Sequence, residues 1–129
     1  MTKERVYLDH AATTPLDKEV FSVMQPYFTD EFGNPSSIHE TGHRVKMAIT
    51  RAREQVAKVL HCRPNEIIFT SGGTESDNLA LKGVAEAHDW KGHVITSAIE
   101  HHAIEDSANY LKKRGLNVTF VKVDKNGMV

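Results

Sequence analysis

The sequence predicts an α/β fold with a mainly parallel sheet and flanking helices. Three observations support this class. Apolar residues recur at helical spacing in some stretches, and short runs rich in β-branched residues lie between them. The two kinds of stretch alternate along the chain, which implies parallel strands joined by right-handed crossovers. The composition of the 129 residues, 40% hydrophobic and 26% charged, is that of an ordinary globular domain.

The first predicted elements lie close to the N-terminus. Residues 5–9 are a short strand-like piece, and residues 11–15 form a turn of small residues. We expect Asp17 to cap a helix and Pro26 to kink or end it. The apolar positions of this helix are Val20, Phe21, Met24 and Tyr27. Residues 32–37, which include glycine, asparagine and proline, predict an irregular loop.

The middle of the chain predicts two helices separated by a strand. A long helix is expected over residues 43–60, and Pro64 stops it. Its apolar stripe consists of Val45, Ala48, Ile49, Ala52, Val56, Val59 and Leu60. Residues 66–70 are a short apolar run that predicts a buried strand. A turn at residues 71–73 then leads into a helix over residues 74–87.

The last predicted elements are a strand at residues 93–97, a helix at 103–114 and a strand at 118–123. Gly115 stands where a left-handed residue commonly follows a helix. Three parallel strands with two crossover helices leave apolar surface and a sheet edge uncovered. We therefore expect a chain that is cut short, with exposed apolar surface and poor solubility. A small, complete open sheet is the alternative.

The composition also argues against several classes of protein. A formal net charge of −1, with no basic run, argues against a nucleic-acid partner. No apolar stretch is long enough to span a membrane, and residues 1–8 contain no signal-peptide core. The single cysteine, Cys62, excludes an internal disulfide framework and favours the reducing cytoplasm. We interpret Cys62 as a helix-end packing or surface residue.

The segment over residues 69–78 predicts a phosphate-binding turn. A strand ends, Gly72 and Gly73 turn the backbone, and a helix begins at Thr74. This arrangement directs unpaired N–H groups and the positive end of a helix dipole at one point. The segment lacks the Walker A and Rossmann glycine patterns, which argues against a nucleoside triphosphate or a dinucleotide. The alternative is a tight turn with Thr74 as an ordinary helix cap.

Two neighbouring histidines follow the strand at residues 93–97. His101 and His102 stand where open α/β sheets place their ligands, beyond the carboxyl end of a strand. An imidazole there can stack on an aromatic cofactor or relay a proton. The alternative is that both are surface residues at a helix start.

The residues His39, Glu40 and His43 match the zincin motif His-Glu-x-x-His. That motif needs a continuous helix, whereas Gly42 and the preceding segment 34–37 favour a loop. A third ligand is not evident. A zinc hydrolase is therefore a remote alternative, and we predict no metal site.

In this order, four blocks resemble the cysteine desulfurases, which are class V aminotransferase-like, pyridoxal-phosphate-dependent enzymes. The blocks are residues 7–15, residues 34–37 with His39 and Gly42, residues 72–78, and Glu100 with His101. The resemblance covers essentially the whole chain. It implies part of the large domain of a fold-type-I pyridoxal-phosphate transferase. Residues 1–15 would join the small domain, and residues 16–129 would form the first part of the cofactor-binding large domain.

The resemblance also implies roles for individual residues. Gly73 and Thr74 would bind the phosphate of pyridoxal 5′-phosphate through a backbone N–H and a hydroxyl group. His101 would lie over the pyridine ring and assist proton transfers, and His102 would not take that role. The Schiff-base lysine, an aspartate facing the pyridine nitrogen, a carboxylate-binding arginine and the sulfur-accepting cysteine would lie further along the polypeptide. Cys62 does not match that cysteine.

The implied activity is removal of sulfur from L-cysteine, which gives alanine and an enzyme persulfide. The sulfur would go to an iron–sulfur scaffold or another acceptor protein, and the parent enzyme would be a cytoplasmic homodimer. These 129 residues alone are expected to be inactive, because the lysine and the catalytic cysteine are missing. The alternatives are a selenocysteine lyase, another class V lyase, or a non-catalytic truncated module.

Overall fold

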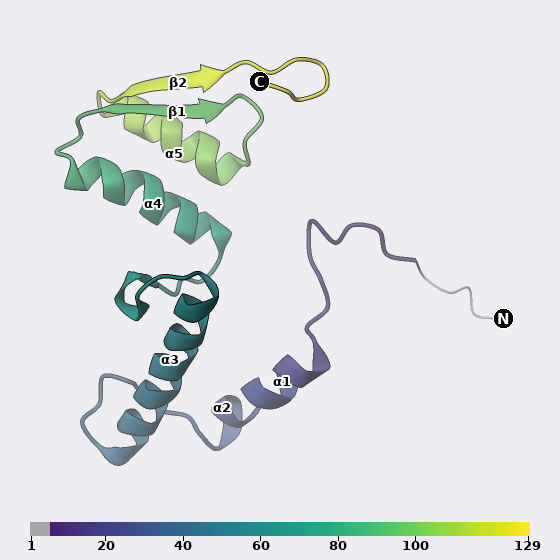
Figure 1. Cartoon of the computed structure of the whole chain (residues 1–129), viewed down its shortest axis with the longest axis vertical. Helices are drawn as coiled ribbons and strands as arrows, with labels where there is room; N and C mark the ends of the chain where they lie inside the picture. The colour runs from purple at the N-terminus through teal and green to yellow at the C-terminus, as the bar shows by residue number, and fades with distance from the viewer. Residues whose placement is uncertain (1–5) are drawn as a thin grey trace. The chain divides into compact units, whose positions relative to one another are not determined.

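The computed structural model describes residues 6–129, which form two compact units that divide between Ile67 and Ile68. The first unit contains α1 (Lys18–Met24), α2 (Pro26–Thr29), α3 (Glu40–Val59) and the 3-10 turn η1 (Pro64–Glu66). The second unit contains α4 (Gly73–Ala87), β1 (His93–Ser97), α5 (His102–Lys113) and β2 (Asn117–Val121), as Figure 1 shows. The predicted boundary between residues 15 and 16 stays a prediction.

Helix α1 begins and ends where the sequence predicts. The Asp17 carboxylate accepts hydrogen bonds from the N–H groups of Glu19 at 2.8 Å and Val20 at 3.4 Å, so the predicted cap of α1 is confirmed. Pro26 ends this helix as predicted and becomes the first residue of α2.

The strand-like piece predicted at residues 5–9 is not formed where the structure describes it. Residue 5 lies outside the described residues, and residues 6–9 belong to no strand. The Asp9 carbonyl instead accepts hydrogen bonds from the N–H groups of Ala12 and Thr13, which begins a turn. A β-strand is stabilised by hydrogen bonds to a neighbouring strand, and this short run has no such neighbour among the described residues.

Helix α3 begins three residues before the predicted start. The His39 ring nitrogen Nδ1 accepts from the N–H of Gly42 at 3.5 Å and caps the helix. Gly42 is buried, and a Cβ on it would lie 2.5 Å from the Ser37 carbonyl oxygen. The loop before the helix therefore packs directly on its first turn, and only glycine permits this close approach.

The buried strand predicted at residues 66–70 is wrong. Pro64 opens the 3-10 turn, and residues 67–70 follow it without pairing to any strand that the structure describes. Ile67 has extended backbone angles, yet Ile68 is 68% exposed. The apolar run has the local preference of a strand, but it lacks the hydrogen-bonded neighbour and the packed face that burial requires.

The second unit follows the prediction closely. Strands β1 and β2 pair in parallel, from His93 opposite Asn117 to Ser97 opposite Val121, and α5 connects them. The range of β1 is as predicted, whereas β2 begins one residue early and ends two residues early. Gly115 has a φ of +96°, which confirms the left-handed residue after α5.

A small core holds the second unit together. Ala85 of α4, Leu111 of α5 and Leu116 are buried in contact, and four partly buried residues surround them: Leu81, Trp90, Val94 and Val118. This core draws on both helices and both strands, so it holds the four elements of the second unit together.

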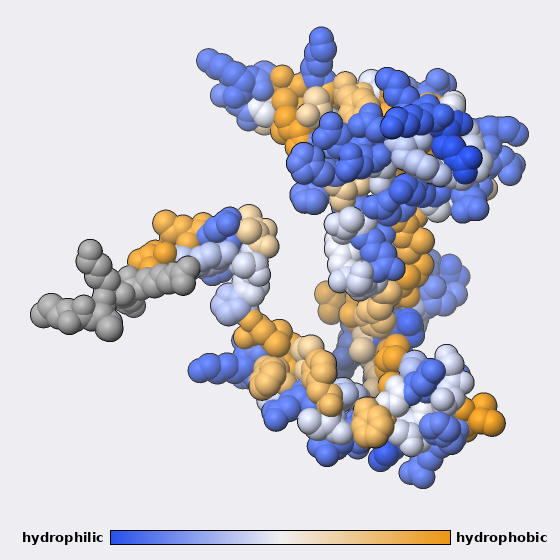
Figure 2. All heavy atoms as spheres, turned by 180° about the vertical axis from the view of Figure 1, so that it is seen from behind, coloured by the Kyte–Doolittle hydropathy of each residue, from blue (hydrophilic) through white to orange (hydrophobic). Residues whose placement is uncertain are grey.

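Much apolar surface stays uncovered, as predicted. Figure 2 shows apolar residues at the surface of both units. In the second unit Val84 is 61% exposed and Ile95 is 65% exposed. No helix among the described residues is long and apolar enough to cross a bilayer.

Candidate phosphate-binding site

The start of α4 presents unpaired backbone N–H groups to open space. Gly72 is the N-cap and has no side-chain cap, and the first intrahelical bond runs from the Ser76 N–H to the Gly72 carbonyl at 3.1 Å. Within residues 6–129 no protein acceptor bonds the N–H groups of Gly73 and Thr74. A Cβ built on either glycine would meet nothing within 4 Å. This turn therefore fits an anion, because donors and space coincide at a helix N-terminus.

The side chain of Glu75 bonds Ser71 and not these N–H groups. Its Oε2 atom accepts from both the N–H and the hydroxyl of Ser71, at 2.6 Å each. The Ser71 hydroxyl, and then its N–H, lower the pKa of the Glu75 carboxyl below its ordinary value. The sequence interpretation assigned no role to this pair, although a serine four residues before a first-turn glutamate is close to the capping-box spacing.

Two linked hydroxyl groups lie beside the carbonyl of Gly72. The hydroxyl oxygens of Thr70 and Ser76 lie 2.6 Å apart, so one donates to the other, and they lie 3.2 and 3.1 Å from the Gly72 carbonyl oxygen, which accepts the remaining proton. Sequence reasoning did not identify this contact either. The hydroxyl of Thr74 has no partner in the described part of the chain, so it can donate to a ligand.

His101 is held at the start of α5. It is the N-cap, and its ring atom Nδ1 accepts from the N–H of Ala103 at 3.1 Å. The first helical residue, His102, has a side chain that is 86% exposed, with Nδ1 3.6 Å from a carboxylate oxygen of Glu105. The backbone thus orients only the first of the two rings, and its Nε2 atom faces away from the cap bond.

The two helix starts lie at the same end of the second unit. Figure 1 shows the N-terminal ends of α4 and α5 at the same end of the second unit as the carboxyl ends of β1 and β2, with α5 between α4 and the strands. The two helices pack against each other, and the parallel strands run in the opposite direction to both. The turn at Gly73 and the ring of His101 therefore belong to the edge at which open α/β sheets bind ligands.

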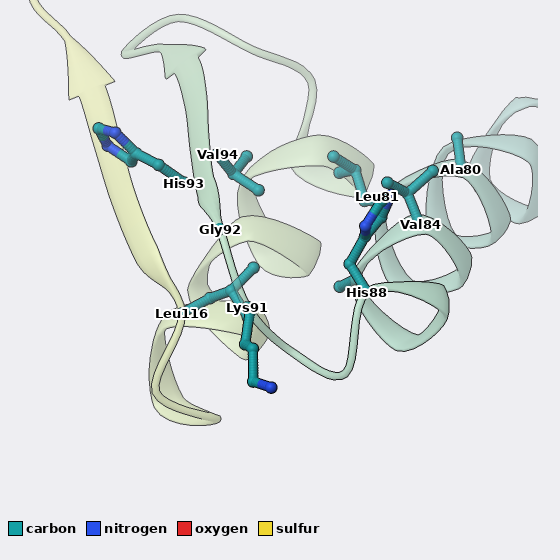
Figure 3. Close-up of a pocket in the computed structure, with 10 residues that line it drawn as sticks. Ala80, Leu81, Val84, His88, Lys91, Gly92, His93, Val94 and Leu116 are labelled. Atoms are coloured by element: carbon teal, nitrogen blue, oxygen red, sulfur yellow. The ribbon is translucent and has the colours of Figure 1, made fainter.

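A separate hollow of about 450 Å³ lies at the other end of this unit. Its lining comes from the second half of α4 and the start of β1, and Figure 3 shows Leu81, Val84 and Val94 around it. At its edge, His93 is bonded through Nε2 to the Thr119 hydroxyl at 2.7 Å. The hollow is mostly apolar and contains none of the predicted site residues.

The zincin-like residues do not form a metal site. The predicted loop is wrong here, because Glu40 and His43 lie in α3, but His39 is the cap and its Nδ1 is bonded to the Gly42 N–H. Among residues 6–129 no group of three or more His, Cys, Asp or Glu side chains is placed to hold a metal ion. Cys62 is half-buried and free, just beyond the end of α3.

The chain is similar to known proteins over nearly its whole length. It is 53% identical over 128 residues to "Cysteine desulfurase IscS" of Dictyoglomus turgidum, covering 98% of this chain and 32% of that protein. It is 55% identical over 125 residues to the protein of the same name from Methanosarcina thermophila, covering 96% of this chain and 31% of that protein. The chain thus spans about a third of the length of these relatives.

Solved structures show the same likeness. A "NifS-like protein" superposes with a TM-score of 0.86 and 43% identity, covering 92% of this chain and 33% of that one. "SspA in complex with cysteine" superposes with a TM-score of 0.83 and 43% identity, covering 89% and 33%. These matches confirm the predicted α/β class and the resemblance to cysteine desulfurases. A model of the family described as aminotransferase class-V matches residues 6–129, and the chain belongs to that family.

Proposed function

We propose that the chain is the N-terminal part of a pyridoxal-phosphate-dependent cysteine desulfurase, which converts L-cysteine to alanine and an enzyme persulfide. One observation carries the proposal: the open N–H groups of Gly73 and Thr74 lie at the same end of the unit as the capped ring of His101. The names of the relatives and a similar structure in complex with cysteine support the substrate.

The residues present fit the cofactor. Gly73 would bind its phosphate through the backbone N–H, and Thr74 through its N–H and hydroxyl, with the dipole of α4 adding to the attraction. When bound, the cofactor supplies an electron sink for the substrate amino acid. His101 would lie over the pyridine ring. Because its Nδ1 is occupied by the Ala103 N–H, proton transfer by this ring falls to Nε2.

The remaining parts of the proposal concern a longer polypeptide. The chain spans about a third of its relatives, which supports placing the Schiff-base lysine and the sulfur-accepting cysteine on a continuation of it. Residues 1–15 would join the small domain there, and residues 16–129 would begin the large domain. We extend the proposal to a cytoplasmic homodimer that passes sulfur to an iron–sulfur scaffold or another acceptor protein. The broad exposed apolar surface supports the proposal that a further part of the longer polypeptide packs against these residues.

Phosphate binding is tested by backbone amide NMR. On titration with inorganic phosphate and with pyridoxal phosphate, we expect the amide signals of Gly73 and Thr74 to shift. The substitution Thr74→Val should weaken phosphate binding roughly tenfold, because it removes one hydrogen bond to a charged group. Thr50→Val is the matched control, since the Thr50 hydroxyl bonds only the Lys46 carbonyl of its own helix. Unmoved signals would contradict the assignment of the site.

The reaction itself is tested on the longer polypeptide. We expect alanine and a protein persulfide from L-cysteine, and a loss of turnover in His101→Ala. Release of selenium from selenocysteine with no reaction of cysteine would favour a selenocysteine lyase. A stop codon immediately after Val129 would favour the non-catalytic module.

A further inference from the structure

We propose that Glu75 is a positioning residue for the cofactor phosphate: by binding Ser71, its carboxylate keeps the N–H groups of Gly73 and Thr74 open. This inference rests on the proposed function, since it concerns the same turn. It adds a residue to which the sequence interpretation gave no role.

The position of Glu75 makes its orientation informative. It lies in the first turn of α4, where a carboxylate is attracted by the helix dipole and by unpaired N–H groups. A carboxylate that capped those groups would compete with a phosphate for the same donors. Here Oε2 accepts instead from the N–H and hydroxyl of Ser71, at 2.6 Å each. The carboxylate thereby bonds the residue before the two glycines and not the N–H groups of Gly73 and Thr74.

Neighbouring side chains reinforce this arrangement. The hydroxyls of Thr70 and Ser76 are bonded to each other and to the Gly72 carbonyl, which belongs to the same peptide as the open N–H group of Gly73. The Asn78 side chain donates to the Thr74 carbonyl at 2.8 Å and holds the peptide between Thr74 and Glu75. The turn is therefore braced on both sides without any side chain bonding the N–H groups of Gly73 and Thr74.

Two effects of Glu75 on a bound phosphate have opposite signs. Its negative charge repels a phosphate dianion, and water weakens this repulsion because Glu75 is exposed. Its hydrogen bonds to Ser71 preorganise the turn, which lowers the entropy that binding must remove. Removing the side chain eliminates both effects. Weaker binding after its removal therefore identifies the positioning role, because the loss of repulsion alone would tighten binding.

The experiment compares three variants of the protein, with inorganic phosphate as the probe and the amide shifts of Gly73 and Thr74 as the readout. Glu75→Ala should weaken phosphate binding about fivefold, the size expected when a helix-start hydrogen bond is lost. Glu75→Gln should bind at least as tightly as the original, because one amide oxygen can accept both bonds from Ser71 and the charge is gone. Glu86→Ala, on the exposed far part of α4, is the matched control and should change nothing.

The exchange rate of the Ser71 N–H gives a second readout that needs no ligand. It should be slow in the original protein and in Glu75→Gln, and faster in Glu75→Ala. Phosphate binding by Glu75→Ala that equals or exceeds the original would overturn the inference. Should that variant fail to fold, Ser71→Ala replaces it: a loss of about twofold, from one hydroxyl bond, supports the role, and unchanged binding overturns it.

The two proposals fail in different ways. If the signals of Gly73 and Thr74 in the original protein do not respond to phosphate, the proposed function is wrong at this turn. If they respond equally in the original and in Glu75→Ala, the phosphate site stands and only the role of Glu75 is lost.

Discussion

The ring atom Nδ1 of His101 accepts a hydrogen bond from the backbone N–H of Ala103 at 3.1 Å. The side chain proposed to face the cofactor therefore also caps α5. Since Nδ1 acts as the acceptor, the neutral ring carries its proton on Nε2. One side chain thus combines a structural role with a proposed chemical role, and substitution at this position has to separate the two.

We predict that His101→Ala lowers the free energy of unfolding by about 1 kcal/mol, because it removes the cap of α5. His101→Asn should keep the stability, since asparagine is among the best N-cap residues, while it removes the ring. His102→Ala should change the free energy by less than about 0.5 kcal/mol, because that side chain is exposed. Urea unfolding followed by circular dichroism measures all three.

Equal destabilisation by the alanine and asparagine variants would show that the ring, rather than the cap, stabilises α5. In the longer polypeptide, a stable His101→Asn variant with an unchanged cofactor spectrum and unchanged turnover would remove the chemical role from this residue.

The second prediction concerns the pH dependence of the turn at the start of α4. The hydroxyl of Ser71, and then its N–H, lower the pKa of Glu75 from the ordinary 4.5. A carboxyl whose pKa is lower in the folded state stabilises that state above the unfolded pKa, and this contribution is lost as the pH falls through the folded pKa. We therefore expect the Ser71 N–H to be protected near pH 7 and to lose protection as the pH falls well below 4.5.

Hydrogen exchange of the Ser71 N–H, corrected for its intrinsic pH dependence, measures this transition directly. Global unfolding is a poorer readout, because Arg63 also lowers the pKa of Glu66, so a second carboxyl contributes to the pH dependence in the same direction. Glu75→Gln should abolish the transition at Ser71 and leave the one at Glu66. A Ser71 N–H that responds to pH equally in both proteins would contradict the assignment.

The sequence predicts elements best where local pattern and tertiary partners agree. The range of β1 is correct because an apolar run, a following turn and an available parallel partner coincide. Residues 66–70 have a similar pattern, but they pair with no strand in the described chain, so the predicted strand fails. A strand needs a neighbour that local preference cannot supply.

The candidate site is predictable only in part. Two glycines before a helix indicate open N–H groups, and a histidine after a strand indicates the ligand edge. The bond between Glu75 and Ser71 depends on a side-chain rotamer and on the turn geometry, which the spacing of the two residues suggests but does not determine. The cap formed by His101 is equally hidden, because histidine is not among the favoured N-cap residues.

The third prediction concerns Gly42. A Cβ at this position would lie 2.5 Å from the Ser37 carbonyl oxygen and 2.7 Å from that of Asn34. Gly42→Ala should therefore lower the free energy of unfolding by about 1–3 kcal/mol through overpacking against backbone. Gly83→Ala is the control: the nearest contact of its Cβ is a Leu79 methyl group at 3.9 Å, so this helical position should gain about 0.5–1 kcal/mol. Thermal unfolding distinguishes the two, and a neutral Gly42→Ala would show that the loop at residues 34–37 moves freely.

The last prediction concerns Ser107, on the buried face of α5. Its side chain is 1% exposed, and its hydroxyl oxygen has no hydrogen-bond partner among the described residues. Burying a hydroxyl without a partner costs about 1–3 kcal/mol, and alanine also has the higher helix propensity. Ser107→Ala should therefore raise the free energy of unfolding, by about 1 kcal/mol after the small loss of packing volume.

Ser97→Ala is the contrasting variant, because it removes a hydroxyl that donates to the Glu100 carboxylate at 2.8 Å, and it should lower the free energy of unfolding. If both variants destabilise equally in urea unfolding, the Ser107 hydroxyl has a partner in solution, such as a buried water, and the expected gain disappears.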